Sequence, residues 1–172
     1  MSCFRNLSAL VVCAAGLICP SLASAQLKVG VINFQRAILE TDEIKKASAD
    51  MQAKYKPRQD GLEQLQKQMA DLQAQLQNPK ITPQQQEELN ARGQKAQRDA
   101  QRLNDDLQAD VERDRQAILQ HAGAQMTEVV RKLATDQGLD VVVDVSSTVF
   151  FKPALEVTDA AVAAYDKTYP VK

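Results

Sequence analysis

In the middle of the chain, apolar side chains recur at alternating spacings of three and four residues. This heptad spacing places them along one side of an α-helix and is typical of a coiled coil. A second run follows between residues 89 and 133, weaker at first and then stronger. We predict that the two runs form the seam of a long helical arm. The seam residues are Leu62, Leu65, Met69, Leu72 and Leu76 from the first run, with Leu103 and Leu107 from the second.

A short proline-containing segment, Asn78-Pro79-Lys80-Ile81-Thr82-Pro83, separates the two runs. Pro79 disfavours helical geometry in the residue before it, whereas Thr82 and Pro83 suit the cap and first position of a new helix. Two helices joined by a short turn pack antiparallel. The pattern therefore predicts a helical hairpin arm over residues 35–137, with its tip near residues 78–83.

Both ends of the chain have β-branched, strand-like patterns instead. Residues 28–34 predict one strand, while residues 139–145 and 148–152 predict two more. A short helix is expected from Thr158 to about Lys167, capped by Thr158 or Asp159. The predicted fold class is α+β. A long antiparallel helical hairpin is inserted into a small β body, formed by residues 26–34 and 138–172, which ends in a short C-terminal helix.

The predicted β body is too small to be stable alone. Three short strands are about the minimum for an independent sheet, and a body of this size usually needs disulfides, a metal or assembly. We therefore expect the body to oligomerise. The residues expected in the oligomerisation core are Val29, Val31, Val141, Val143, Val149 and Phe151.

Residues 1–25 have the pattern of a signal peptide. Arg5 precedes an apolar run from Leu7 to Cys19, and Ala23-Ser24-Ala25 forms a small-x-small cleavage pattern before Gln26. The run is shorter than the roughly 20 residues of a membrane anchor. Large residues before the cysteines disfavour a lipoprotein. All three cysteines lie in this segment, so we expect a thiol-free mature chain in the periplasm.

Composition and charge narrow the function further. Aromatic residues make up 4% of the chain, and none occurs between Tyr55 and Phe150, which favours an elongated molecule. The net charge is −1, and removal of Arg5 with the signal peptide leaves 20 Lys and Arg against 22 Asp and Glu. A polycationic nucleic-acid binder is therefore excluded.

No residue pattern indicates catalysis, a metal or a cofactor. His121 is the only histidine, and a solvated helix position explains it best. Asp140 and Asp144 are interpreted as edge-strand charges that discourage aggregation. The chain has no phosphate-binding glycine loop and no nucleophile elbow. We therefore predict a protein that is not an enzyme and uses no cofactor.

The two ends of the mature chain resemble the OmpH/Skp family of periplasmic chaperones for outer-membrane proteins. The resemblance is carried by LKVGVINFQRAILETDEIKKA and by ATDQGLDVVVDVSSTVFFKPALEVTDAAVAAYD. It implies a homotrimer whose three arms enclose a cavity for unfolded outer-membrane β-barrel proteins, held without ATP. Several relatives are strongly basic, so the acidic balance here implies at most weak membrane or lipopolysaccharide contact. The resemblance does not assign client-binding residues.

Three other classes of protein share parts of this pattern. A structural or adaptor coiled coil of the cell envelope would share the arm and bind one folded partner. The hairpin adaptor of an efflux or secretion pump would need larger β domains beside the hairpin. An interfacial membrane binder would need a strongly basic face opposite Trp or Phe side chains.

Overall fold

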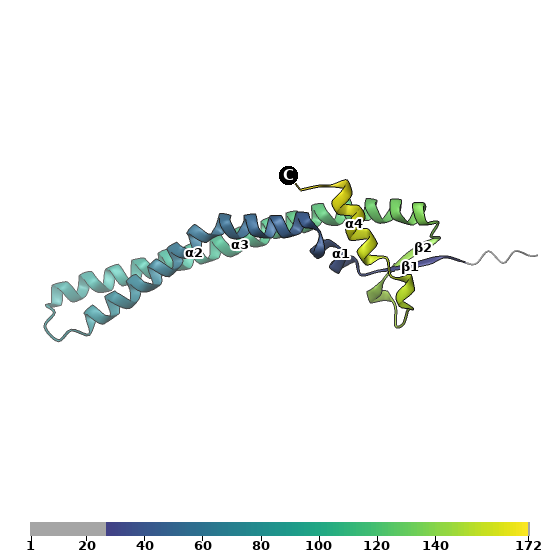
Figure 1. Ribbon diagram of the computed structural model, residues 1–172. Helices are drawn as coiled ribbons and strands as arrows, with labels where there is room; N and C mark the ends of the chain where they lie inside the picture. The colour runs from purple at the N-terminus through teal and green to yellow at the C-terminus, as the bar shows by residue number, and fades with distance from the viewer. Residues whose placement is uncertain (1–26, 172) are drawn as a thin grey trace, which may run out of the picture.

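The computed structural model describes residues 27–171, in which a long two-helix arm projects from a small body (Figure 1). Strand β1 (Val29–Ile32) leads through α1 (Phe34–Glu40) into α2 (Asp42–Leu76). The chain turns and returns along α3 (Pro83–Gln137), which lies beside α2 throughout the arm. Strand β2 (Val141–Asp144), two short 3-10 turns and α4 (Thr158–Thr168) complete the described part. The predicted antiparallel hairpin, the small body and the C-terminal helix are confirmed.

The turn at the tip forms as its residues predict. Thr82 Oγ1 accepts a hydrogen bond from the Gln85 backbone N–H at 3.2 Å, and Gln85 Oε1 accepts one from the Thr82 N–H at 2.9 Å. This reciprocal capping box satisfies two backbone donors that a helix start leaves free. Pro83, which has no N–H to satisfy, occupies the first turn.

The arm predicted from residue 35 does not begin as one continuous helix. Thr41 is extended (φ −65°, ψ 149°) and separates α1 from α2. Its side chain is completely buried and accepts a hydrogen bond from the Ile44 N–H. Asp42 and Glu43 follow in the first turn of α2, where negative charge is favourable. Thr41 is therefore a helix cap that redirects the chain from the body into the arm.

The sheet contains two parallel strands in the described chain, with Val29 opposite Val141 and Ile32 opposite Asp144. The expected third strand over residues 148–152 is wrong, because this segment lies between two 3-10 turns and pairs with no strand. An isolated bridge joins Val31 to Glu156 instead. Glu156 therefore takes the edge of β1 that a third strand would have needed.

The cap expected for the last helix is also wrong. Helix α4 has Val157 at its N-cap and no side-chain cap hydrogen bond. Thr158 Oγ1 instead accepts from the Asn33 N–H at 2.9 Å and lies 3.0 Å from Glu156 Oε1. The hydroxyl therefore joins the start of α4 to the end of β1.

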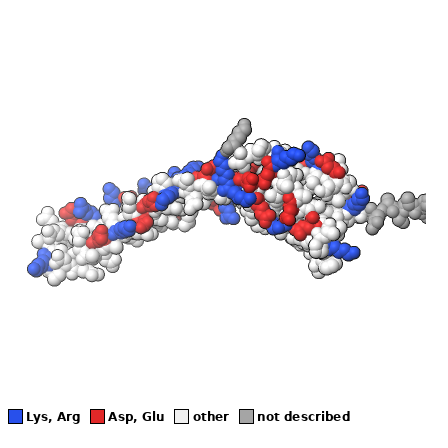
Figure 2. All heavy atoms as spheres, viewed as in Figure 1, with Lys and Arg blue, Asp and Glu red and all other residues white. Residues whose placement is uncertain are grey.

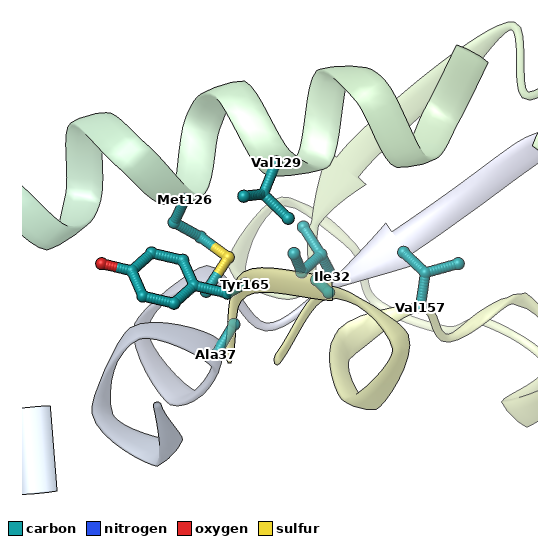
Figure 3. Close-up of a cluster of buried hydrophobic side chains, with 7 residues drawn as sticks. Ile32, Ala37, Met126, Val129, Val157 and Tyr165 are labelled. Carbon is teal, nitrogen blue, oxygen red and sulfur yellow. The ribbon is translucent and has the colours of Figure 1, made fainter. Parts of the chain in front are cut away.

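The core lies where the body meets the root of the arm (Figure 3). Met126 and Val129 reach it from α3, Ile32 from β1 and Tyr165 from α4. Met126 and Tyr165 are 0% exposed, so each contributes its full apolar surface to the core. One cluster thus holds together segments from both ends of the described chain.

Replacement of glycine by alanine is expected to have opposite effects on stability at two positions of α3 and its C-terminus. Gly138 ends α3 with a left-handed backbone (φ 63°), so Gly138→Ala should lower the free energy of unfolding by about 1–2 kcal/mol. Gly93 lies inside α3, and a Cβ there would meet nothing within 4 Å. Gly93→Ala should raise the free energy of unfolding by about 1 kcal/mol. Urea unfolding followed by circular dichroism measures both, and shifts of the same sign would contradict the assignment.

Candidate functional site

The body leaves large apolar side chains uncovered. Val149 is 107% exposed and Phe150 is 82% exposed, on the segment between the two 3-10 turns. Leu27 at the start of the described chain is 65% exposed. Single exposed apolar residues are common on proteins, but an adjacent Val-Phe pair at such exposure favours a surface that another molecule covers.

The structure divides the predicted oligomerisation core between the interior and the surface. Val31 is buried within the chain itself, and Val143 lies opposite it across the sheet and is half-buried. Val141 and Val149 are exposed. Val29 and Phe151 are also half-buried. The role of all six residues in assembly stays a prediction.

The predicted seam residues lie on the covered side of the arm. Leu72 and Leu107 are buried. Toward the tip, α3 adds Leu89 and the small residues Ala96 and Ala100, which are also buried. The seam is therefore occupied by contact between α2 and α3. The remaining predicted seam residues, Leu62, Leu65, Met69, Leu76 and Leu103, are half-buried.

A group of polar side chains joins the two helices halfway along the arm. Tyr55 is 3% exposed, and its hydroxyl donates to Asp114 Oδ2 at 2.7 Å. Lys54 donates to the same oxygen, and Arg58 donates to Asp110. The Lys54 ammonium also lies 5.2 Å from the centre of the Tyr55 ring, within cation–π range. We name these five residues the mid-arm polar cluster: Lys54, Tyr55, Arg58, Asp110 and Asp114.

The mid-arm polar cluster depends on its carboxylates being ionised. The hydrogen bond from Lys54, followed by that from Tyr55, holds the pKa of Asp114 below its ordinary value. The hydrogen bond from Arg58 lowers the pKa of Asp110 in the same way. A carboxyl whose pKa is lower in the folded state stabilises the fold at neutral pH. That stabilisation is lost as pH falls through the lowered pKa.

Asp114→Asn should therefore lower the thermal unfolding midpoint at pH 7, because the amide cannot pair with Lys54 as a charge. The difference from the unmodified chain should begin to shrink as pH falls below about 4, the ordinary pKa of an aspartate in an unfolded chain, and should continue to shrink until the folded chain is protonated as well. Asp71→Asn is the control, because the exposed Asp71 carboxylate on α2 makes no hydrogen bond or ion pair with a described residue. A difference that persists unchanged at pH 2 would contradict the electrostatic role of the cluster.

The root of the arm is held to the C-terminal helix by Tyr165. Its hydroxyl lies 2.5 Å from Glu43 Oε2 on α2 and 2.6 Å from Gln125 Oε1 on α3. Burial, and then the hydrogen bond to Glu43, raise the pKa of Tyr165. One residue later, Asp166 accepts from the Asp42 N–H at the start of α2. Helix α4 therefore contacts both helices of the arm.

Basic and acidic side chains are interspersed along the visible face of the arm (Figure 2). Several form ion pairs along one helix, such as Glu63 with Lys67 and Glu88 with Arg92. Exposed pairs of this kind contribute little to stability. This arrangement agrees with the net charge of −1, and neither positive nor negative charge dominates this face.

The residues considered for chemistry have other roles. The His121 side chain is 64% exposed and lies 3.9 Å from Glu43. Asp140 accepts from the Lys28 N–H at 2.7 Å. Asp144 accepts from the Ser146 and Phe34 N–H groups, and the hydrogen bonds from Ser146 lower its pKa. Both aspartates thus satisfy backbone donors around the sheet, which the interpretation as edge charges missed.

Over residues 27–171, no group of three or more His, Cys, Asp or Glu side chains is placed to hold a metal ion. Within the same range, no helix has the length and apolar character needed to cross a membrane.

Sequence patterns had not singled out the acidic half of the mid-arm polar cluster. Asp110 and Asp114 are four residues apart on α3, so they lie on one helix face. They stand beside the apolar seam at the height of Tyr55, which lies seven residues before Leu62. The cluster has a sequence signal: two acids spaced four residues apart beside the seam of one helix, and a Lys and an Arg spaced four residues apart beside the seam of the other.

Residues 28–165 match the family described as outer membrane protein (OmpH-like). The Skp-like protein of Pseudomonas aeruginosa PAO1 is 25% identical over 159 residues, which cover 90% of this chain and 93% of that protein. In its fold, the chain is similar to the crystal structure of an OmpH-like protein from Caulobacter crescentus CB15. The TM-score is 0.71 at 21% identity, covering 86% of this chain and 89% of that one. The chain therefore belongs to the OmpH/Skp-like family of outer-membrane-protein chaperones, which are periplasmic and non-enzymatic.

Proposed function

We propose that the mature chain, residues 26–172, is an ATP-independent holdase that binds unfolded outer-membrane β-barrel proteins between the helical arms of a homotrimer. The observation that carries this proposal is the combination of a long arm with a small body whose Val149 and Phe150 side chains are uncovered. Such a body gains stability by covering its apolar surface with further copies. Assembly through the bodies would leave the arms free to surround a client.

The arm surface suits a client without fixed structure. An unfolded β-barrel chain exposes apolar side chains and unpaired backbone groups, which makes it prone to aggregate. Glutamine amides, such as those of Gln64 and Gln68 on α2, are exposed and can both donate to and accept from such a backbone. Many weak contacts of this kind add up to firm binding, yet each can break without an energy source.

The proposed location depends on residues 1–25, which lie outside the described residues. Cleavage after Ala25 would release a chain without cysteine into the periplasm, where the family resides. N-terminal sequencing of the protein recovered from the periplasm tests the cleavage position directly. Gln26 is the expected first residue.

The proposed function is tested by diluting an outer-membrane β-barrel protein from urea into buffer that contains residues 26–172 and no nucleotide. We expect a several-fold excess of the chain to suppress the rise in light scattering. Size exclusion with light-scattering mass should show three copies of the chain with one soluble client. The chain contains no Trp, so Trp fluorescence identifies the client in each fraction. Unchanged scattering would overturn the proposal and favour the envelope adaptor.

A further inference from the structure

A short apolar groove lies at the root of the arm, where α1, α2 and α3 meet. It has a volume of about 250 Å³. Helix α2 lines it with Ile44, Ala47 and Met51, which are spaced along one helix face. Helix α3 lines it with Ile118 and Leu119. The groove is therefore continuous with the apolar face that forms the seam farther along the arm.

The groove is not filled by the chain itself. Leu39, at the end of α1, lines it and is 48% exposed. Met51, Ile118 and Leu119 are only half-buried. Covering the exposed apolar surface of these side chains would therefore be favourable. The groove is smaller than the roughly 300–1,000 Å³ of typical small-molecule sites, and it suits one large side chain.

One cation borders this apolar surface. Among the described residues that line the groove, Arg115 alone is charged. Its guanidinium makes no hydrogen bond or ion pair with a described residue, whereas the neighbouring Arg113 and Asp114 are paired with each other and with the mid-arm polar cluster. A guanidinium is well suited to bind a carboxylate through two parallel hydrogen bonds. The groove therefore combines space for one apolar side chain with a free partner for one carboxylate.

We propose that this groove binds the C-terminal residue of an unfolded client, with its apolar or aromatic side chain in the groove and its α-carboxylate on Arg115. A chain terminus is the place in an unfolded protein where the backbone itself carries a carboxylate beside a side chain. This inference rests on the proposed function and adds a preference among clients. Weak contacts along the arm hold the rest of the client, so the groove favours chains with an apolar end.

The test uses two fluorescein-labelled decapeptides of identical sequence ending in Phe, one with a free C-terminal carboxylate and one amidated. Fluorescence anisotropy with residues 26–172 measures their affinities. We expect the free acid to bind roughly fivefold more tightly than the amide, as one partly exposed charge pair allows. Arg115→Gln should abolish this preference and leave the affinity for the amide unchanged.

Two further substitutions provide controls for charge and for shape. Arg102→Gln removes a cation from the same helix that makes no hydrogen bond or ion pair with a described residue, and it should leave the preference intact. Ser48→Phe places a bulky side chain in the groove and should weaken both peptides, whereas Ser48→Ala should weaken neither. Circular dichroism confirms that each variant keeps the helical content of the original chain.

Equal affinities for the acid and the amide, or a preference that survives Arg115→Gln, would overturn the proposal.

Two measurements test for other occupants of the groove. Displacement of the peptide by dodecanoate at lower concentration than by N-acetylphenylalanine would assign the groove to an acyl chain. A change in light-scattering mass with Ser48→Phe would assign it to a second copy. Both results also overturn the proposal. Suppression of client scattering by the original chain is measured in parallel, and its failure would reject the proposed holdase function instead.

Discussion

Tyr165→Ala is expected to lower the free energy of unfolding by about 3–5 kcal/mol, the range for an aromatic ring removed from a packed core. The ring is 0% exposed and belongs to the cluster that contains Met126 and Ile32. It also lies 5.1 Å from the ring of Tyr169. Truncation would leave a cavity where α4 meets the arm. Urea unfolding followed by circular dichroism, at one fixed protein concentration, measures the loss.

Tyr165→Phe separates the ring from the hydroxyl. The ring stays in place, while the hydrogen bonds to Glu43 and Gln125 are lost. We expect a cost of about 1 kcal/mol, because Glu43 remains partly exposed and can bind water instead. If Phe and Ala lower the stability equally, the hydroxyl and not the packed ring holds α4.

Phe150→Asp is expected to convert the proposed homotrimer to single chains. Each chain should stay folded, because Met126 and Val129 from α3 complete the core of the body. Phe150 is 82% exposed in the single chain, so a carboxylate at this position loses little contact within the body. In an assembly that covers this surface, the same carboxylate would be buried without a partner, at a cost of several kcal/mol. Light-scattering mass after size exclusion should fall from the three copies of the proposed trimer to one, with unchanged helical content.

Val31→Asp provides the contrast within the same body. Val31 is 2% exposed and packs inside its own chain, so the buried charge should unfold the body and not merely separate the copies. Circular dichroism and mass distinguish these two outcomes. An unaltered mass for Phe150→Asp would show that the exposed apolar segment is not the assembly surface.

Local patterns were sufficient to predict the arm. The heptad spacing of Leu72 and its neighbours predicts the covered side of α2, and Leu107 is buried as the second run requires. Thr82, Pro83 and Gln85 predict the turn because capping depends on adjacent residues only. The seam and the tip could therefore be predicted because both depend on residues that are close together in the sequence.

The body was harder to predict, because strands depend on distant partners. Val149, Phe150 and Phe151 favour a strand by residue type, yet they form none because Glu156 bridges to β1. The break at Thr41 had a local signal, since Thr-Asp-Glu is a good helix start. The break itself could not be predicted, because the residues on both sides of Thr41 are also good helix formers and suit one continuous helix. The groove near Arg115 depends on three helices meeting, which spacing along one helix does not reveal.

The parallel pairing of Val29 with Val141 has a consequence for the order of folding. The two strands are separated by the whole arm, so their contact has a high sequence separation and a large loop-closure cost if the arm is unfolded. Helix formation in the arm needs only local contacts, and its hairpin brings the two strands together. We therefore expect the arm to form first and the body last. An exported chain would carry an unfinished body until residues beyond 141 have entered the periplasm, so assembly would begin only after export is nearly complete.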